Sequence, residues 1–197
     1  MTVILRADAG PTMGTGHVMR SAALGLRMRR LGHDVSLVTA SLPDSVRAWL
    51  SSCDIEVITL PPGAETEDGE ELSAVTRTLG PGDWVVVDHY ERDESWEVQI
   101  DRGGARLCVI DDLADRRHDC DALIDVGMHA LVGDPYRNLV PADTELLLGP
   151  SFALLRPEFE GMIPRERTGE ISRVLVSLGG GDLVADELLK VLAALAQ

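Results

Sequence analysis

The sequence predicts an α/β fold built on a doubly wound parallel sheet, and two observations carry this prediction. Residues 84–87 and 107–110 are short runs without a polar side chain, which is typical of strands buried on both faces. Stretches with apolar residues at three- and four-residue spacing lie between such runs, as in amphipathic helices. Alternation of the two patterns indicates a parallel sheet covered by helices on both sides.

The first strand–loop–helix unit lies at the start of the chain. Residues 3–5 are an apolar strand, and Gly14 and Gly16 interrupt any regular continuation. A helix is expected from about His17, and Gly32 stands where a helix C-cap belongs. The unit therefore brings a strand, a glycine loop and a helix start together around a histidine.

This loop has the features of a binding site for a negatively charged group. Gly14 and Gly16 let the backbone approach a ligand, and the free amides of a helix start favour a phosphate or a developing oxyanion. The third glycine of the dinucleotide fingerprint and the Lys-Ser/Thr pair of a P-loop are missing, so both of these motifs are weak here. A neutral His17 imidazole is suited to act as a general base, although a role in capping or loop packing stays open. Arg20, three residues later, is expected to contact a phosphate or to pair with Asp8.

Further elements follow the same alternation. Strands are expected at residues 34–39, 56–60, 84–87, 107–110 and 123–124, and helices at 45–50 and 71–79. The intervening segment 61–69 has the composition of a solvated loop, and the charges around it and the following helix are expected to face solvent.

Aspartates follow several of the predicted strands, and they are Asp8, Asp88, Asp111, Asp112 and Asp125. Because the carboxyl ends of parallel strands meet at one edge, where ligands bind in open α/β sheets, these side chains are expected to gather there. They would hold sugar hydroxyl or amide groups, or orient His17, Arg20 and His89. His89 and Tyr90 are expected to form walls of a polar pocket. Helix N-caps are the alternative for the aspartates, and a packed surface loop for His89 and Tyr90.

The C-terminal quarter changes character. Residues 1–160 are predicted to form one domain, 161–171 a polar linker, and 172–197 the start of an incomplete second domain. That start has a strand at 174–178, a glycine turn containing Gly180 and Gly181, and a helix at 185–195. One such unit cannot cover a parallel sheet on both faces, so a missing C-terminal domain is expected.

Composition excludes several classes of protein. The 197 residues carry a formal charge of -15, which argues against nucleic acid or an anionic membrane as a partner. No apolar run is long enough to span a bilayer and no leader is recognisable, so a cytoplasmic protein is expected. Cys53, Cys108 and Cys120 fit reduced core thiols, and His118 with Cys120 is a weak metal pair, so neither a metal nor a cofactor is expected.

An ordered series of motifs resembles one known family. The series is Arg6-x-Asp8, Gly14-x-Gly16-His17-x-x-Arg20, Asp88-His89-Tyr90, Asp111-Asp112, His118-x-Cys120-Asp121, Leu148-Gly149-Pro150, Leu154-Leu155-Arg156-Pro157-Glu158-Phe159 and Gly179-Gly180-Gly181-Asp182. Together these motifs resemble the UDP-2,4-diacetamido-2,4,6-trideoxy-β-L-altropyranose hydrolases of pseudaminic acid biosynthesis, which are related to spore-coat polysaccharide proteins. Asp125-Val126-Gly127 departs from the asparagines that family members often carry there, which leaves the sugar specificity open.

The resemblance implies a glycosyltransferase-B-like architecture, in which two Rossmann-like domains enclose the active cleft. His17 would activate water for attack on the anomeric carbon of a UDP-sugar, with inversion and release of UDP. Tyr90 would help to hold the sugar, Asp8, Arg20 and Asp88 would position groups, and the loop with Gly180 and Gly181 would line the cleft. The missing domain would hold most of the UDP, so the 197-residue chain alone is expected to be inactive.

Two other functions stay open. One is a nucleotide-sugar glycosyltransferase resembling the enzyme that adds GlcNAc to the lipid-linked peptidoglycan precursor, which needs a membrane-facing patch. No basic amphipathic stretch is recognisable, and Arg27, Arg29 and Arg30 are expected on a solvated helix face. The other is a sugar-recognition module without turnover.

Overall fold

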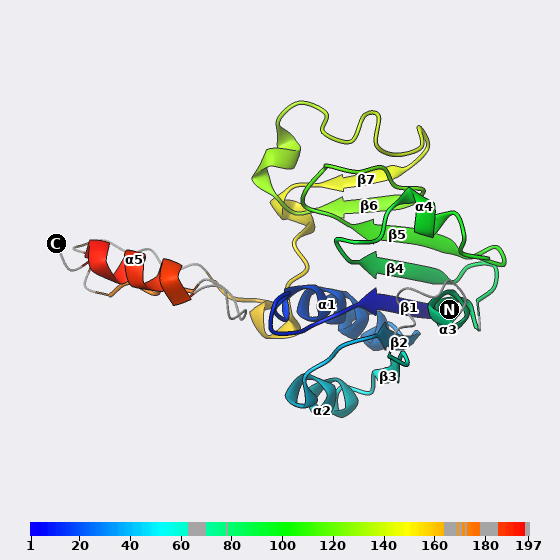
Figure 1. Ribbon diagram of the computed structural model, residues 1–197, viewed down its shortest axis with the longest axis horizontal. Coiled ribbons are helices and arrows are strands. Elements are labelled where there is room, and N and C mark those ends of the chain that lie inside the picture. Colours follow the sequence, from blue (N-terminus) through cyan, green and yellow to red (C-terminus); the bar gives the residue numbers. More distant parts are fainter. Residues whose placement is uncertain are drawn as a thin grey trace.

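A seven-stranded sheet forms the centre of the molecule (Figure 1). The computed structural model describes residues 1–62, 70–77, 79–163, 169, 171, 173–177 and 185–195. The strands are β1 (Thr2–Ala7), β2 (Asp34–Thr39), β3 (Glu56–Thr59), β4 (Trp84–Asp88), β5 (Arg106–Ile110), β6 (Ala122–Asp125) and β7 (Glu145–Leu148). Every neighbouring pair is parallel, in the order β3-β2-β1-β4-β5-β6-β7. The predicted α/β class with a parallel sheet is confirmed.

Helices cover both faces of this sheet. The described chain has the helices α1 (Gly16–Arg30), α2 (Asp44–Ser52), α3 (Glu70–Thr76), α4 (Glu94–Glu97) and α5 (Ala185–Leu195), and the 3-10 turns η1 (Met128–Leu131), η2 (Pro150–Phe152) and η3 (Pro157–Phe159). The first four helices lie against the sheet, and α5 lies apart from it (Figure 1). One apolar core packs α1 and α2 against alternate residues of the strands, and a second core packs α3, α4 and Tyr136 against the other face. Both faces of the central strands are therefore buried, which explains the continuous apolar sequences of β4 and β5.

Strand β1 lies at the point where the strand order reverses. It pairs with β2 on one side and with β4 on the other, so the connections leaving β1 and β4 run in opposite directions along the sheet. Ligands bind in α/β sheets in the crevice outside the carboxyl ends of the strands at such a point. The loop after β1 and the residues after β4 are consequently the first place to look for a site.

Helix α1 packs closely on β1 and β2. Its C-terminal turn ends before Gly32, whose φ of +85° is the left-handed conformation that favours glycine. Gly25 faces the sheet, and a Cβ atom there would lie 2.9 Å from Leu5 Cδ1 and 3.1 Å from Val35 Cγ1. The absence of a side chain at Gly25 thus sets how near α1 lies to the sheet.

Several elements differ from the sequence predictions. β7 and α4 were not predicted, because β7 has four residues before Gly149-Pro150 and α4 is a single turn. The strand predicted at 174–178 is wrong for residues 174–177, which have no strand pairing, and Leu178 lies outside the described residues. An isolated apolar run becomes a strand only where a neighbour supplies backbone partners.

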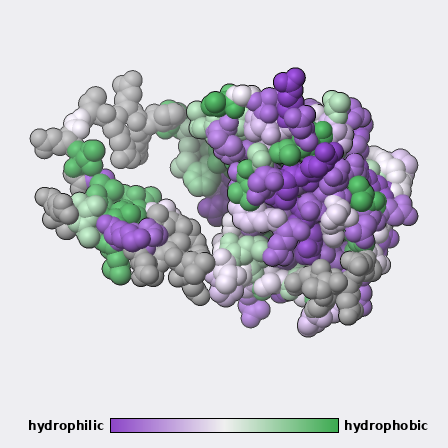
Figure 2. Space-filling model, turned by 45° about the horizontal axis from the view of Figure 1, so that its top comes forward, coloured by the Kyte–Doolittle hydropathy of each residue, from purple (hydrophilic) through white to green (hydrophobic). Residues whose placement is uncertain are grey.

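The predicted helix at residues 185–195 is confirmed as α5. Its leucines are largely uncovered, with Leu189 64% and Leu192 50% exposed. Figure 2 shows the resulting apolar surface on this segment, at the left of the view. In the part of the chain that the structure describes, no helix has the length and apolar character needed to cross a membrane.

Candidate active site at the carboxyl edge of the sheet

The loop after β1 is closed by its own backbone before α1 begins. Gly10 and Gly14 exchange two backbone hydrogen bonds of 3.0 and 2.7 Å, and Gly14 has a φ of +75°. A Cβ atom at Gly16 would meet nothing within 4 Å. The loop is therefore a compact turn that leaves open space beside the first residue of α1.

The alternation of side chains along β4 and β5 brings two aspartates to the α1 side of the sheet. Trp84 and Val86 of β4, and Cys108 and Ile110 of β5, face the core beneath α1. Asp88 and Asp112 continue these two series at the carboxyl ends of the strands. They meet His17 and Arg20, which lie three residues apart on one side of α1.

His17 is held by Asp88 in one tautomer. The imidazole Nδ1 lies 2.6 Å from Asp88 Oδ1, and both residues are buried. An ionised carboxylate only accepts hydrogen bonds, so Nδ1 carries the proton and donates a hydrogen bond to Asp88. Nε2 has no hydrogen-bond partner among the described residues. The lone pair of Nε2 is thus available to a ligand or to water, as a general base requires.

Tyr90 lies beside this imidazole. The two rings meet edge to face, with centroids 4.5 Å apart and an interplanar angle of 87°. Tyr90 is 42% exposed, so its ring borders solvent, and its place in the wall of a pocket stays a prediction. Burial and the negative charge of Asp112 raise the pKa of its hydroxyl, which keeps Tyr90 a neutral hydrogen-bonding group.

Arg20 is bound between two carboxylates. Its Nε and Nη2 donate to Asp88 over 2.5 and 2.8 Å, and Nη1 donates to Asp112 Oδ2 over 2.8 Å. Burial opposes the charge of Arg20, but the hydrogen bonds and charges of Asp88 and Asp112 outweigh it and raise the pKa of the guanidinium. Burial likewise opposes ionisation of Asp112, and Arg20 outweighs it and lowers the pKa of that carboxyl. The expected pairing of Arg20 with Asp8 is not observed.

Asp8 belongs to a separate network on the other face of the sheet. It accepts hydrogen bonds from Thr39 Oγ1 and from the Ala40 amide, and pairs with Arg6 over 2.7 Å. His89 Nε2 donates a hydrogen bond to Asp8 over 3.0 Å, and His89 Nδ1 accepts a hydrogen bond from the backbone amide of Glu91. Both ring nitrogens of His89 are occupied and its side chain is buried. The expectation that His89 forms a wall of the pocket is therefore wrong.

Glu71 extends this network to α3. It accepts from Arg6 Nε over 2.5 Å and from Arg92 Nη2 over 2.9 Å, and is 2% exposed. The prediction that charges in this part of the chain face solvent is wrong for Glu71. The pairing of Glu71 with Arg6 joins residues 65 positions apart, so no local pattern reveals it.

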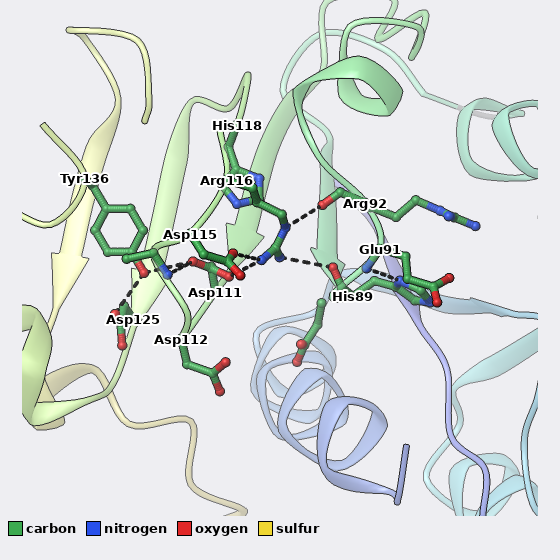
Figure 3. Close-up of polar contacts among 12 residues, drawn as sticks. His89, Glu91, Arg92, Asp111, Asp112, Asp115, Arg116, His118, Asp125 and Tyr136 are labelled. Carbon is green, nitrogen blue, oxygen red and sulfur yellow. Dashed lines mark hydrogen bonds and ion pairs between the residues drawn. The ribbon is translucent and has the colours of Figure 1, made fainter. Parts of the chain in front are cut away.

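A third polar network joins the ends of β5 and β6 (Figure 3). The buried Tyr136 hydroxyl lies 3.1 Å from Asp111 Oδ2 and 2.8 Å from Asp125 Oδ2. Arg116 pairs with Asp111 over 3.0 Å and donates to the backbone carbonyls of His89 and Arg92. His129 Nε2 lies 3.0 Å from Asp125. Tyr136 was missed by the sequence analysis because it lies outside any periodic segment.

The five aspartates do gather at one edge, but on two sides of it. Asp88 and Asp112 lie with His17 and Arg20, whereas Asp8, Asp111 and Asp125 bind the other two networks. Each of them pairs with side chains of other segments, which is more than the N-cap alternative requires. Gly180 and Gly181 lie outside the described residues.

Metal ligands do not cluster in the part of the chain that the structure describes, where no group of three or more His, Cys, Asp or Glu side chains is arranged around a common point. His118 instead pairs with Glu97 through Nδ1 over 2.7 Å. Cys108 and Cys120 are buried free thiols and Cys53 is partly buried, in agreement with the prediction of core cysteines.

Comparison with known proteins gives one informative similarity. The chain is 26% identical over 200 aligned positions to the UDP-2,4-diacetamido-2,4,6-trideoxy-beta-L-altropyranose hydrolase of Campylobacter jejuni. The alignment covers 96% of this chain and 66% of that relative, so the chain spans less than two thirds of the relative's length. No family model matches the sequence, and no solved structure matches it. The resemblance inferred from the ordered motifs is thereby confirmed.

Proposed function

We propose that the complete protein hydrolyses a nucleotide sugar, with His17 as the general base. The observation that carries this proposal is the buried His17–Asp88 pair, which lies where the strand order reverses. Nε2 of His17 has no hydrogen-bond partner among the described residues. The similarity to a hydrolase of a UDP-linked diacetamido sugar supports UDP and such a sugar as the substrate.

The proposed step is attack of water on the anomeric carbon. The water oxygen forms a bond to that carbon on the side opposite the diphosphate, and the sugar carbon–oxygen bond breaks. The electron pair of this bond stays on the diphosphate oxygen, which leaves as UDP, while His17 Nε2 takes a proton from the water. Asp88 stabilises the resulting imidazolium, which later returns the proton to solvent.

The other site residues have supporting roles in this proposal. A diphosphate is a good leaving group, so positioning of the water and the sugar is the main demand on the protein. Tyr90 borders the imidazole and would contact the sugar. The Gly14–Gly16 turn leaves room beside the helix start for the substrate. In a glycosyltransferase-B-like arrangement, a second domain with Gly180 and Gly181 would complete the cleft and hold the nucleotide.

His17→Gln is the direct test. The variant of the complete protein is expected to lose about a hundredfold to ten-thousandfold in UDP release, because the amide cannot act as a base. Its thermal unfolding should stay near that of the unchanged protein. Release would be followed in EDTA with UDP-linked 6-deoxy-diacetamido sugars and no acceptor.

Each other outcome points elsewhere. A folded His17→Gln variant with full activity would exclude His17 as the base. Turnover that appears only with an added acceptor would favour the glycosyltransferase, and binding without turnover would favour a sugar-recognition module. Loss of release in EDTA would contradict a metal-independent reaction.

A further inference from the structure

The His17–Asp88 pair poses an electrostatic problem for a general base. A buried carboxylate 2.6 Å from an imidazole stabilises the imidazolium form. Imidazolium has no lone pair and cannot take a proton from water. Asp88 alone would therefore fix the useful tautomer of His17 and at the same time favour its inactive charged form.

Arg20 supplies the opposing charge. Two of its nitrogens donate to the two oxygens of Asp88, so the guanidinium offsets negative charge that His17 meets. Arg20 Nη2 also lies 3.4 Å from His17 Nδ1. Both of these nitrogens carry protons, so the contact becomes repulsive when the imidazole is charged. A guanidinium does not lose its proton at any relevant pH, so a cation that opposes the imidazolium form of His17 is always present.

Asp112 fixes Arg20 in this place. It accepts from Arg20 Nη1 over 2.8 Å, on the side away from Asp88. All three nitrogens of the guanidinium thus bind carboxylates, and Arg20 is only about one-fifth exposed. These contacts use three of the five N–H groups of the guanidinium and hold its plane between two carboxylates, so Arg20 cannot turn toward a substrate phosphate without breaking them.

We propose that Arg20 is a positioning residue that keeps His17 uncharged at neutral pH while Asp88 holds its tautomer, and that Asp112 fixes Arg20 for this purpose. This inference rests on the proposed function and concerns the acidic limit of its activity. The ionisable groups that face His17 are Asp88 from β4, Arg20 from α1, Tyr90 after β4 and Asp112 after β5.

The test is the pH profile of kcat/KM for UDP release by the complete protein and its Arg20→Gln and Arg20→Lys variants. In Arg20→Gln the imidazolium loses a neighbouring cation, so the acidic limb is expected to move upward by about one pH unit or more. Activity near neutral pH would fall about tenfold and recover toward alkaline pH. Arg20→Lys keeps the charge, so its acidic limb should lie near that of the unchanged protein.

Arg30→Met is the matched control, because Arg30 lies on the same helix, pairs with Glu160 and is about half exposed. Its profile should not move. If Arg20 bound the substrate phosphate instead, Arg20→Gln would raise KM by a similar factor at every pH, and the acidic limb would stay in place. Either that result or an unchanged profile would overturn the inference.

A second measurement separates this inference from the proposed function. The protonation of His17 can be followed by NMR through its imidazole signals, assigned with His17→Gln, without substrate. Arg20→Gln should raise the pH at which these signals change, and an unmoved titration would exclude the role of Arg20. Absence of UDP release from the unchanged protein would contradict the proposed function, whatever the imidazole titration shows.

Discussion

His17 and His89 differ in what their second ring nitrogen meets. Both lie at the carboxyl edge of the sheet and both donate to a buried aspartate. The Glu91 amide occupies the remaining nitrogen of His89, whereas Nε2 of His17 meets no hydrogen-bonding group of the described chain. The sequence placed both histidines at the edge, but a choice between them depends on contacts with Asp88 and Asp8 across 71 and 81 positions. Such contacts leave no local pattern.

Asp8→Asn should destabilise the protein at neutral pH. Burial opposes ionisation of Asp8, but hydrogen bonds from His89 and Arg6 and the charge of Arg6 outweigh it and lower the pKa of the carboxyl. A lowered folded-state pKa gives stability that is present above the unfolded value of about 4 and is lost as the pH falls through the folded-state value. Removal of one partner from a buried pair costs about 3 kcal/mol. Urea unfolding at neutral pH measures this loss in the free energy of unfolding.

The control for Asp8→Asn is Asp34→Asn, because the Asp34 side chain is 86% exposed. This variant should change the free energy of unfolding little. The difference between the Asp8→Asn variant and the unchanged protein should also narrow below about pH 4. Equal stability of the Asp8→Asn variant and the unchanged protein at neutral pH would show that the Asp8 network does not stabilise the fold.

Helix α1 carries both His17 and Arg20, so its distance from the sheet sets the geometry of the site. The Gly25→Ala substitution should shift α1 relative to the sheet. Alanine favours the helix by about 1 kcal/mol, but its Cβ would lie 2.9 Å from Leu5 Cδ1, so α1 or its neighbours must move. We expect a net loss of about 1–3 kcal/mol of stability, and a loss of kcat/KM larger than that of other variants of equal stability.

Thermal unfolding together with UDP release tests Gly25→Ala. Arg27→Ala is the comparison on the same helix, since the Arg27 side chain is 60% exposed. It should leave both quantities nearly unchanged. Unchanged activity in a destabilised Gly25→Ala variant would show that the site tolerates movement of α1.

The elements that the sequence predicted well are those with their own periodic pattern. α1 and the apolar strands β4 and β5 agree with prediction to within a few residues. β7 was missed because it is completed only by pairing with β6, and residues 174–177 were overpredicted because they have no such pairing. Pairing is a property of the whole sheet, which a single segment does not contain.

At the scale of the whole molecule, the segment around α5 should make the 197-residue chain self-associate. Leu175 is 93% exposed, and Leu189 and Leu192 of α5 are at least half exposed. Exposed apolar surface of this kind favours association. Light scattering over a range of concentrations should show a rising mass, which the double substitution Leu189→Gln and Leu192→Gln should reduce. A constant monomer mass at high concentration would contradict this.

The buried carboxylates of the sheet edge all have cationic or histidine partners, although the chain as a whole carries a formal charge of -15. The acidic excess therefore lies mostly on the outer surface, while the edge itself is close to neutral. An anionic nucleotide sugar would be repelled at long range and then arrive where little net charge opposes it. At about 0.1 M salt, dissolved ions largely screen the repulsion between charges more than about 10 Å apart. Salt should thus govern how often a substrate arrives, while the rate of the proposed chemistry at His17 should change little with salt.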